Sequence, residues 1–174
     1  TDDLKRRHQL SNLTLHEMSL LDIAELKQSF DLISSTGVIH HLPNPSLALD
    51  AFKSVLKPDG AVHIMVYGKT LRTGIYWLQN FFRTLNILPK TEAEVWKALE
   101  FIKCLPNRHP VHSYIAAAKF DLAYEGAVID TFFHPQDVSY FVNEIFELVD
   151  QVDLKFHGFK MNGDYFHEHV LGHK

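Results

Sequence analysis

The chain has 174 residues, of which 46% are hydrophobic and 22% are charged, as is ordinary for a globular protein with one core. Its net charge of -4 and the lack of any Lys/Arg-rich run argue against a nucleic-acid partner, because phosphate binding needs clustered cations. The lone cysteine, Cys104, cannot form an internal disulfide, and no apolar run suits a signal peptide or a membrane span, so we expect a cytoplasmic protein without a membrane partner.

The first part of the chain predicts short elements. Residues 3–8 are polar and read as the end of a helix, and residues 12–16 alternate as a short strand does. Residues 30–35 form an apolar run with a β-branched residue, which predicts a strand. Leu and Phe side chains then recur at helical spacing over residues 45–56, which predicts an amphipathic helix.

Lys57, Pro58, Asp59 and Gly60 predict a helix stop and a turn, since proline cannot extend the helix and glycine tolerates a positive φ. Residues 61–67 are almost continuously apolar, which is typical of a parallel strand buried on both faces. The succession of strand, helix and strand predicts a βαβ unit.

From residue 72 to about residue 124 the pattern is helical and rich in aromatic residues, which predicts an inserted helical cap. A second helix is expected over residues 135–149, with Pro135 in its first turn. Residues 154–161 and 167–171 predict two closing strands.

Two segments of this pattern, Phe30–Leu42 and Val55–Tyr67, resemble the second half of a class I S-adenosylmethionine-dependent methyltransferase. Three further phrases resemble a bacterial subgroup of that family with a helical insertion. They are Met65–Tyr76, Arg108–Pro110 and His134–Asp137 with Tyr140. The family's glycine-rich loop has no counterpart here. The resemblance implies an α/β fold, a partial Rossmann-like methyltransferase sheet, with residues 1–174 forming a single truncated domain and a helical insertion at about 72–130.

The resemblance also implies where S-adenosylmethionine would bind. It places Ser35, Thr36 and Gly37 beside the methionine part of the cofactor, and Ser19 and Leu20 beside the adenine. The first three residues follow a strand, and ligands of open α/β sheets bind over the carboxyl ends of strands. The alternative is that Ser-Thr-Gly is only a turn that ends the strand.

His40 and Tyr67 are the candidate catalytic residues, although no catalytic group is fixed by the sequence. The imidazole of His40 or of its neighbour His41 can act as a general base, or the pair can have a packing role, which we favour. Tyr67 can line the acceptor pocket or merely close its edge. His134 and Asp137 are three residues apart at an expected helix start, where capping is the favoured role.

Twelve histidines raise the question of a metal, above all His167, His169 and His173 near the end of the chain. Neither a CxxC nor an HExxH pattern accompanies them, and clustered histidines in a tail are more often solvated surface. We predict no metal site from the sequence.

The expected function is transfer of a methyl group from S-adenosylmethionine to a small-molecule acceptor, by a chain that is an incomplete fragment and inactive alone. The alternative is a non-catalytic remnant or interaction module, because fold does not imply function. In a truncated sheet the strand at residues 30–35 would have an unpaired edge. Either the 12–16 segment covers this edge or a second copy does, and we expect a homodimer or a rearranged sheet.

Overall fold

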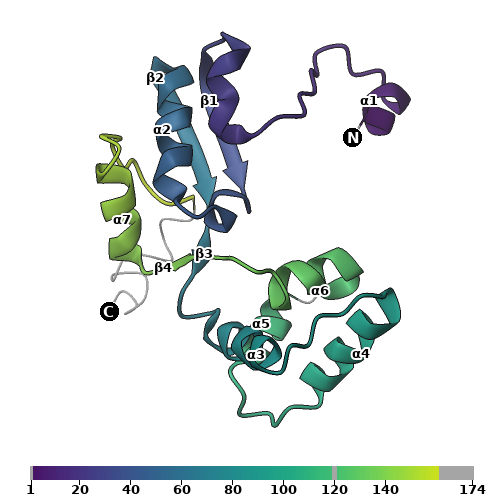
Figure 1. The fold of residues 1–174 in the computed structure, drawn as a ribbon. Helices are drawn as coiled ribbons and strands as arrows, with labels where there is room; N and C mark the ends of the chain where they lie inside the picture. The colour runs from purple at the N-terminus through teal and green to yellow at the C-terminus, as the bar shows by residue number, and fades with distance from the viewer. Residues whose placement is uncertain (1, 119–120, 161–174) are drawn as a thin grey trace, which may run out of the picture.

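The computed structural model describes residues 2–118 and 121–160. Short strands and helices alternate at first, the helices α3 to α6 follow, and a strand and a helix complete the described part (Figure 1). The elements are α1 (Asp2–Arg7), η1 (Leu20–Leu26), β1 (Phe30–Thr36), η2 (Ile39–His41), α2 (Pro45–Val55), β2 (Leu56–Met65), β3 (Tyr67–Gly68), α3 (Thr73–Thr84), α4 (Glu92–Lys103), α5 (Val111–Ala117), η3 (Asp121–Ala123), α6 (Glu125–Phe132), β4 (Ser139–Tyr140) and α7 (Val142–Asp150).

The β1–α2–β2 unit confirms the predicted strand, helix and strand. β1 and β2 pair in parallel, with Ile33 opposite Val62. The Asn44 side chain accepts a hydrogen bond of 3.1 Å from the backbone N–H of Ser46 and so caps α2, and Pro45 occupies the first turn. One face of α2 packs with β1, β2 and α7 in a hydrophobic cluster. This mixed fold is consistent with the predicted partial Rossmann-like sheet.

Two details of this unit differ from the sequence prediction. Lys57–Gly60 do not form a separate turn but lie within β2, where Phe30 pairs with Leu56 and Leu32 pairs with Ala61, so the extra residues form an irregularity in the register. The expected burial of the strand on both faces is also wrong. β1 and β2 form a sheet of two strands, and every residue of β2 is either exposed or only partly buried.

The predicted strand at residues 12–16 is wrong, since these residues adopt no regular structure and none is buried. They are not paired with β1, so the described residues do not cover the β1 edge in the way that one of our alternatives required. A short alternating pattern is stable as a strand only where a partner offers hydrogen bonds. The polar helix before it is confirmed as α1.

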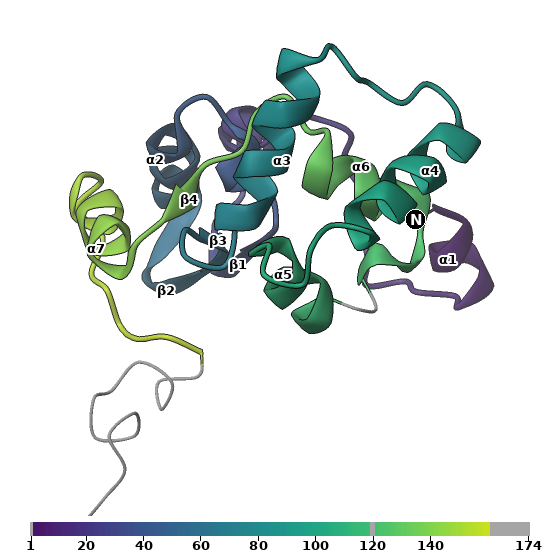
Figure 2. The ribbon, with the colours of Figure 1, turned by 90° about the horizontal axis from the view of Figure 1, so that it is seen from below.

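The stretch expected to be helical contains α3, α4, α5 and α6, which share a second hydrophobic cluster of their own. Figure 1 shows these helices below the arrowheads of β1 and β2, and Figure 2 shows α3 beside the short strands β3 and β4. The helical layer therefore lies at the carboxyl ends of the strands, the edge at which open α/β sheets bind ligands. Among the described residues, no helix is long and apolar enough to cross a membrane.

The predicted helix over residues 135–149 begins too early, because α7 starts at Val142. The preceding residues are drawn into long-range contacts instead. Ser139 and Tyr140 form β4, which pairs in parallel with β3, and the backbone N–H of Val138 donates to the His40 carbonyl at 2.8 Å. The predicted closing strand at 154–161 is not formed over residues 154–160, and residues 161 and 167–171 lie outside the described part.

Candidate functional site at the carboxyl end of the sheet

The carboxyl end of β1 carries three of the residues assigned to the cofactor. Ser35 is buried and Thr36 is exposed at the last two positions of β1. Gly37 has a φ of 73° and donates its backbone N–H to the carbonyl of Met65 at 3.3 Å, which turns the chain from the strand toward η2. This left-handed φ favours glycine. The geometry agrees with a turn and leaves the cofactor assignment a prediction.

Ser19 and Leu20 lie at the start of η1. The Ser19 hydroxyl accepts a hydrogen bond of 3.2 Å from the backbone N–H of Leu21 and so caps η1. Leu20 packs against the hydrophobic cluster of the βαβ unit. Within the described part of the chain, no hydrogen bond, ion pair or ring contact joins these two residues to Ser35–Gly37, so their adenine-binding role also stays a prediction.

His40 and Tyr67 lie together, with ring centroids 3.9 Å apart. His40 is fully buried, and this burial, followed by the nearby His41 and Arg72, lowers its pKa from 6.5 to about 4. The ring is therefore neutral at pH 7 and a poor proton acceptor. Its geometry suits the packing role better than that of a base.

Tyr67 lies between His40, Asp130 and Arg72. Its hydroxyl donates to Asp130 Oδ2 at 3.2 Å, and its ring lies 3.7 Å from the guanidinium carbon of Arg72. Burial, followed by the negative charge of Asp130, raises the pKa of this hydroxyl. Tyr67 is thus a hydrogen-bond donor at physiological pH rather than a base.

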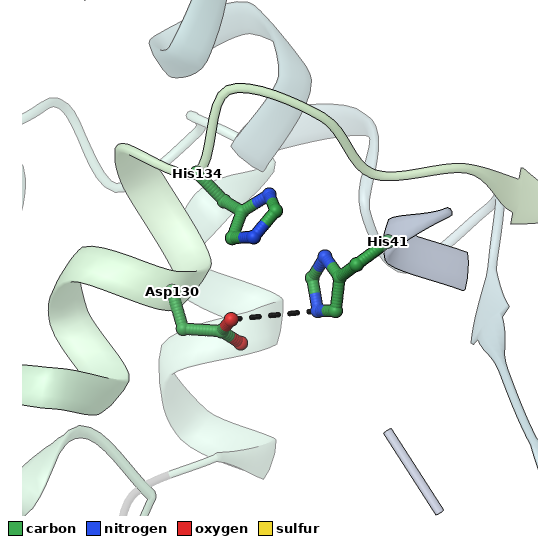
Figure 3. Close-up of side chains that lie close together, drawn as sticks. All are labelled: His41, Asp130 and His134. Carbon is green, nitrogen blue, oxygen red and sulfur yellow. Dashed lines mark ion pairs between the residues drawn. The ribbon is translucent and has the colours of Figure 1, made fainter. Parts of the chain in front are cut away.

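His41, Asp130 and His134 converge beside these rings from η2, α6 and the residue that follows the end of α6 by two positions (Figure 3). His41 Nε2 is 3.4 Å from Asp130 Oδ1, and the ring centroids of His41 and His134 are 4.0 Å apart. The His41 side chain is 16% exposed and that of Asp130 is 42% exposed. Unlike His40, this group is within reach of solvent and of a ligand.

Gln136 orients both histidines through its backbone. Its carbonyl accepts a hydrogen bond of 3.1 Å from His41 Nδ1, and its N–H donates to His134 Nδ1 at 3.1 Å. Because a carbonyl can only accept, His41 carries a proton on Nδ1, and the neutral ring keeps its lone pair on Nε2. That lone pair points toward Asp130.

A buried ion pair underlies the site. Arg72 donates to Asp137, and the two side chains are 1% and 0% exposed. Asp137 also accepts a hydrogen bond of 3.3 Å from Gln79 Nε2. The capping role expected for Asp137 is therefore wrong: the residue precedes α7 by five positions and holds the outgoing and returning ends of the helical segment together.

Comparison with known proteins identifies the family. Residues 3–127 match the family model for a methyltransferase domain. The chain belongs to this methyltransferase family. The resemblance found in the sequence is confirmed, and the β1–α2–β2 unit lies within the matched residues.

Similar proteins support the same family at low identity. The methyltransferase domain is 29% identical over 82% of its length to an uncharacterized protein of Synechococcus sp., of which it covers 35%. It is 27% identical over 58% of its length to the ubiquinone biosynthesis O-methyltransferase of Haemophilus ducreyi and 25% identical over 78% to that of Neisseria meningitidis, and covers 45% and 50% of them. The chain thus spans half or less of the length of these relatives.

Sequence reasoning missed two residues of this cluster and its surroundings and assigned others to different roles. Asp130 had no local signal, since it is an ordinary acidic position on an amphipathic helix. Arg72 marked only the start of the insertion, yet it is almost fully buried. His41 was considered with His40, and His134 was considered as a cap. The histidines at 167, 169 and 173 lie outside the described residues.

Proposed function

We propose that this methyltransferase domain transfers a methyl group from S-adenosylmethionine to a hydroxyl oxygen of a small molecule, with His41 as the general base. The observation that carries the proposal is the His41 Nδ1–H bond of 3.1 Å to the Gln136 carbonyl, which leaves Nε2 free to accept a proton beside Asp130. The names of the relatives, O-methyltransferases, support an oxygen acceptor.

Proton transfer at this position is physically reasonable. The separation of 3.4 Å between His41 Nε2 and Asp130 Oδ1 is longer than an ordinary hydrogen bond and too short for a group to lie between the two atoms, so we propose that a hydroxyl group approaches the Nε2 lone pair from the solvent side of the pair. As the hydroxyl loses its proton to Nε2, the Asp130 carboxylate stabilises the imidazolium that forms. Tyr67 donates to the other oxygen of Asp130 and so fixes the orientation of the carboxylate.

The cofactor side rests on Ser35, Thr36 and Gly37, with Ser19 and Leu20 toward the adenine. When bound there, S-adenosylmethionine supplies an electrophilic methyl group. The positive φ of Gly37 fits this proposal, because a Cβ at this position would meet only the Met65 Cε, at 3.7 Å, and the backbone is open to a close ligand. No two of the 8 glycines are separated by a single residue, so we propose that this chain holds only part of the cofactor site.

Calorimetric titration of this chain with S-adenosylhomocysteine tests cofactor binding. Saturable 1:1 heat supports the enzyme, whereas no heat means that this segment cannot hold the cofactor alone. Methyl transfer is then measured in the protein that contains this segment, using His41→Gln and, as the matched control, the exposed His16→Gln. Loss of the base should lower kcat by about 10² to 10⁴. Full activity of His41→Gln would overturn the role of His41.

A second candidate is a non-catalytic remnant or interaction module. It is favoured by the exposed face of β1, where Leu32 is 63% exposed, together with the partial coverage of the relatives. β1 also has an unpaired backbone edge, because its sheet contains only β1 and β2 among the described residues. A second copy of the chain that pairs along β1 would cover this edge, and we therefore propose a homodimer. The exposed free thiol of Cys104 supports our proposal of a cytoplasmic location.

A further inference from the structure

We propose that His41, Asp130 and His134 bind a divalent transition-metal ion, of which Zn²⁺ is the natural probe. One ligand atom from each residue lies within 4.8 Å of the other two. Two imidazole nitrogens and one carboxylate are ligands typical of zinc and related metals, and three protein ligands leave a further position open. Mg²⁺ and Ca²⁺ prefer oxygen ligands and fit this set less well.

One pair of ligands already has the spacing that a metal requires. His41 Nε2 and Asp130 Oδ1 are 3.4 Å apart. Two ligands at bonds of about 2.0 to 2.1 Å around a tetrahedral Zn²⁺ are themselves about 3.4 Å apart. With the widest separation in the group limited to 4.8 Å, closure of the site needs a side-chain movement of about 1.4 Å at most toward this spacing.

Contacts behind the ligands orient their lone pairs toward one another. His41 donates from Nδ1 to the Gln136 carbonyl, which directs the Nε2 lone pair into the cluster. Asp130 accepts from the Tyr67 hydroxyl through Oδ2, which leaves Oδ1 to face His41. Partners of this kind, a carbonyl behind a histidine and a donor behind a carboxylate, commonly support metal ligands.

His134 supplies a signature of binding. Its Nδ1 accepts the backbone N–H of Gln136 at 3.1 Å. Ligation through Nδ1 uses that lone pair, and ligation through Nε2 moves the ring proton onto Nδ1. Metal binding therefore breaks the bond from the Gln136 N–H in either case, and a structural change at this amide accompanies occupancy.

The ion would join η2, next to the sheet, to α6 and the following residues of the helical layer. It would also occupy the His41 lone pair that proton abstraction requires. Excess Zn²⁺ is therefore expected to inhibit methyl transfer. This inhibition rests on the proposed function, whereas the binding itself does not and is measured without cofactor or acceptor.

The test is calorimetric titration of Zn²⁺ into the untagged, chelator-treated chain. The histidines at 167, 169 and 173 are replaced by Gln in every sample, so that the other histidine cluster is removed. We expect one site at micromolar affinity or tighter. His41→Gln and His134→Gln should each weaken it at least about tenfold, while the exposed His16→Gln leaves it unchanged.

Two further measurements keep the proposal open to refutation if a histidine variant fails to fold. Asp130→Asn retains the size of the side chain and should also weaken binding. In the chain that carries only the three Gln replacements at 167, 169 and 173, the NMR resonance of the Gln136 amide should shift on saturation with Zn²⁺. Absence of a site, or binding that is indifferent to all three replacements, would overturn the proposal. Intact Zn²⁺ binding without S-adenosylhomocysteine binding would support the metal site and count only against cofactor binding by this chain alone.

Discussion

Gly74, the second residue of α3, lies at a close approach of α3 to the start of α5 in the helical layer. A Cβ atom built there would lie 2.2 Å from the backbone nitrogen of Val111 and 2.6 Å from the carbonyl carbon of Pro110, at the start of α5. Backbone atoms cannot rotate away as the end of a flexible side chain can. The substitution Gly74→Ala must therefore push α3 and α5 apart.

The magnitude follows from two opposing effects. Separating the helices until the 2.2 Å contact becomes an ordinary one of about 3.4 Å disturbs a packed cluster, and such overpacking costs about 1 to 3 kcal/mol. Replacing glycine by alanine also restricts the unfolded chain, which stabilises the fold by about 0.4 to 1 kcal/mol. We expect Gly74→Ala to lower the free energy of unfolding by about 1 to 2 kcal/mol.

Gly126 provides a matched control, because it is the second residue of α6 and a Cβ there would meet only the Tyr124 ring, at 3.6 Å. Gly126→Ala should be neutral or stabilising by about 0.5 kcal/mol. Urea unfolding followed by circular dichroism measures both variants. If Gly74→Ala were as stable as the parent, the close approach of α3 and α5 would not constrain the fold and the reasoning would fail.

Three other predictions concern buried charge, pH and association. Arg72→Met and Asp137→Leu should each lower the free energy of unfolding in urea by about 3 to 5 kcal/mol, because each leaves the other charge buried without a partner. The double variant should lose much less than the sum of the two single losses. Strictly additive losses would contradict this reasoning. The pKa of His40 is about 4 in the folded chain and 6.5 in the unfolded chain, so as the pH falls the unfolded chain takes up the proton before the folded chain does. Up to about 3 kcal/mol of the free energy of unfolding should therefore be lost as the pH falls from 6.5 to 4. His40→Phe should flatten this pH dependence, and an unchanged profile would refute its cause. Light scattering should find a dimer that Leu32→Lys weakens, and a monodisperse parent monomer would rule out pairing along β1.

The sequence predicted the elements whose contacts are local. The apolar run of β1 and the helical spacing and cap of α2 are set by neighbouring residues, and the parallel pairing of β1 with β2 follows from the connection between them. The resemblance to methyltransferases rested on these same segments. Their carboxyl ends point to the edge of the sheet at which His41, Asp130 and His134 lie together.

The residues that complete the site depend on long-range contacts. Asp130 reaches His41 across 89 positions of sequence, and no local pattern distinguishes it from other acidic residues on helices. Residues 135–141 have an apolar spacing that continues into α7, but the bonds of Gln136 to His41 and of Val138 to His40 favour an extended backbone. Tertiary contacts here outweigh a helical pattern, and Asp137 is buried as an ion-pair partner rather than exposed as a cap.

The pairing of β3 with β4 brings the points at which the chain leaves and re-enters the sheet unit side by side. Gly68 lies opposite Tyr140, and Arg72 and Asp137 join the two connections just beyond this pair. A segment whose ends meet in this way can be lengthened, shortened or exchanged during evolution without altering the strands that carry it. Under the proposed function, the helical segment on the acceptor side could therefore diverge independently of the strands proposed to meet the cofactor.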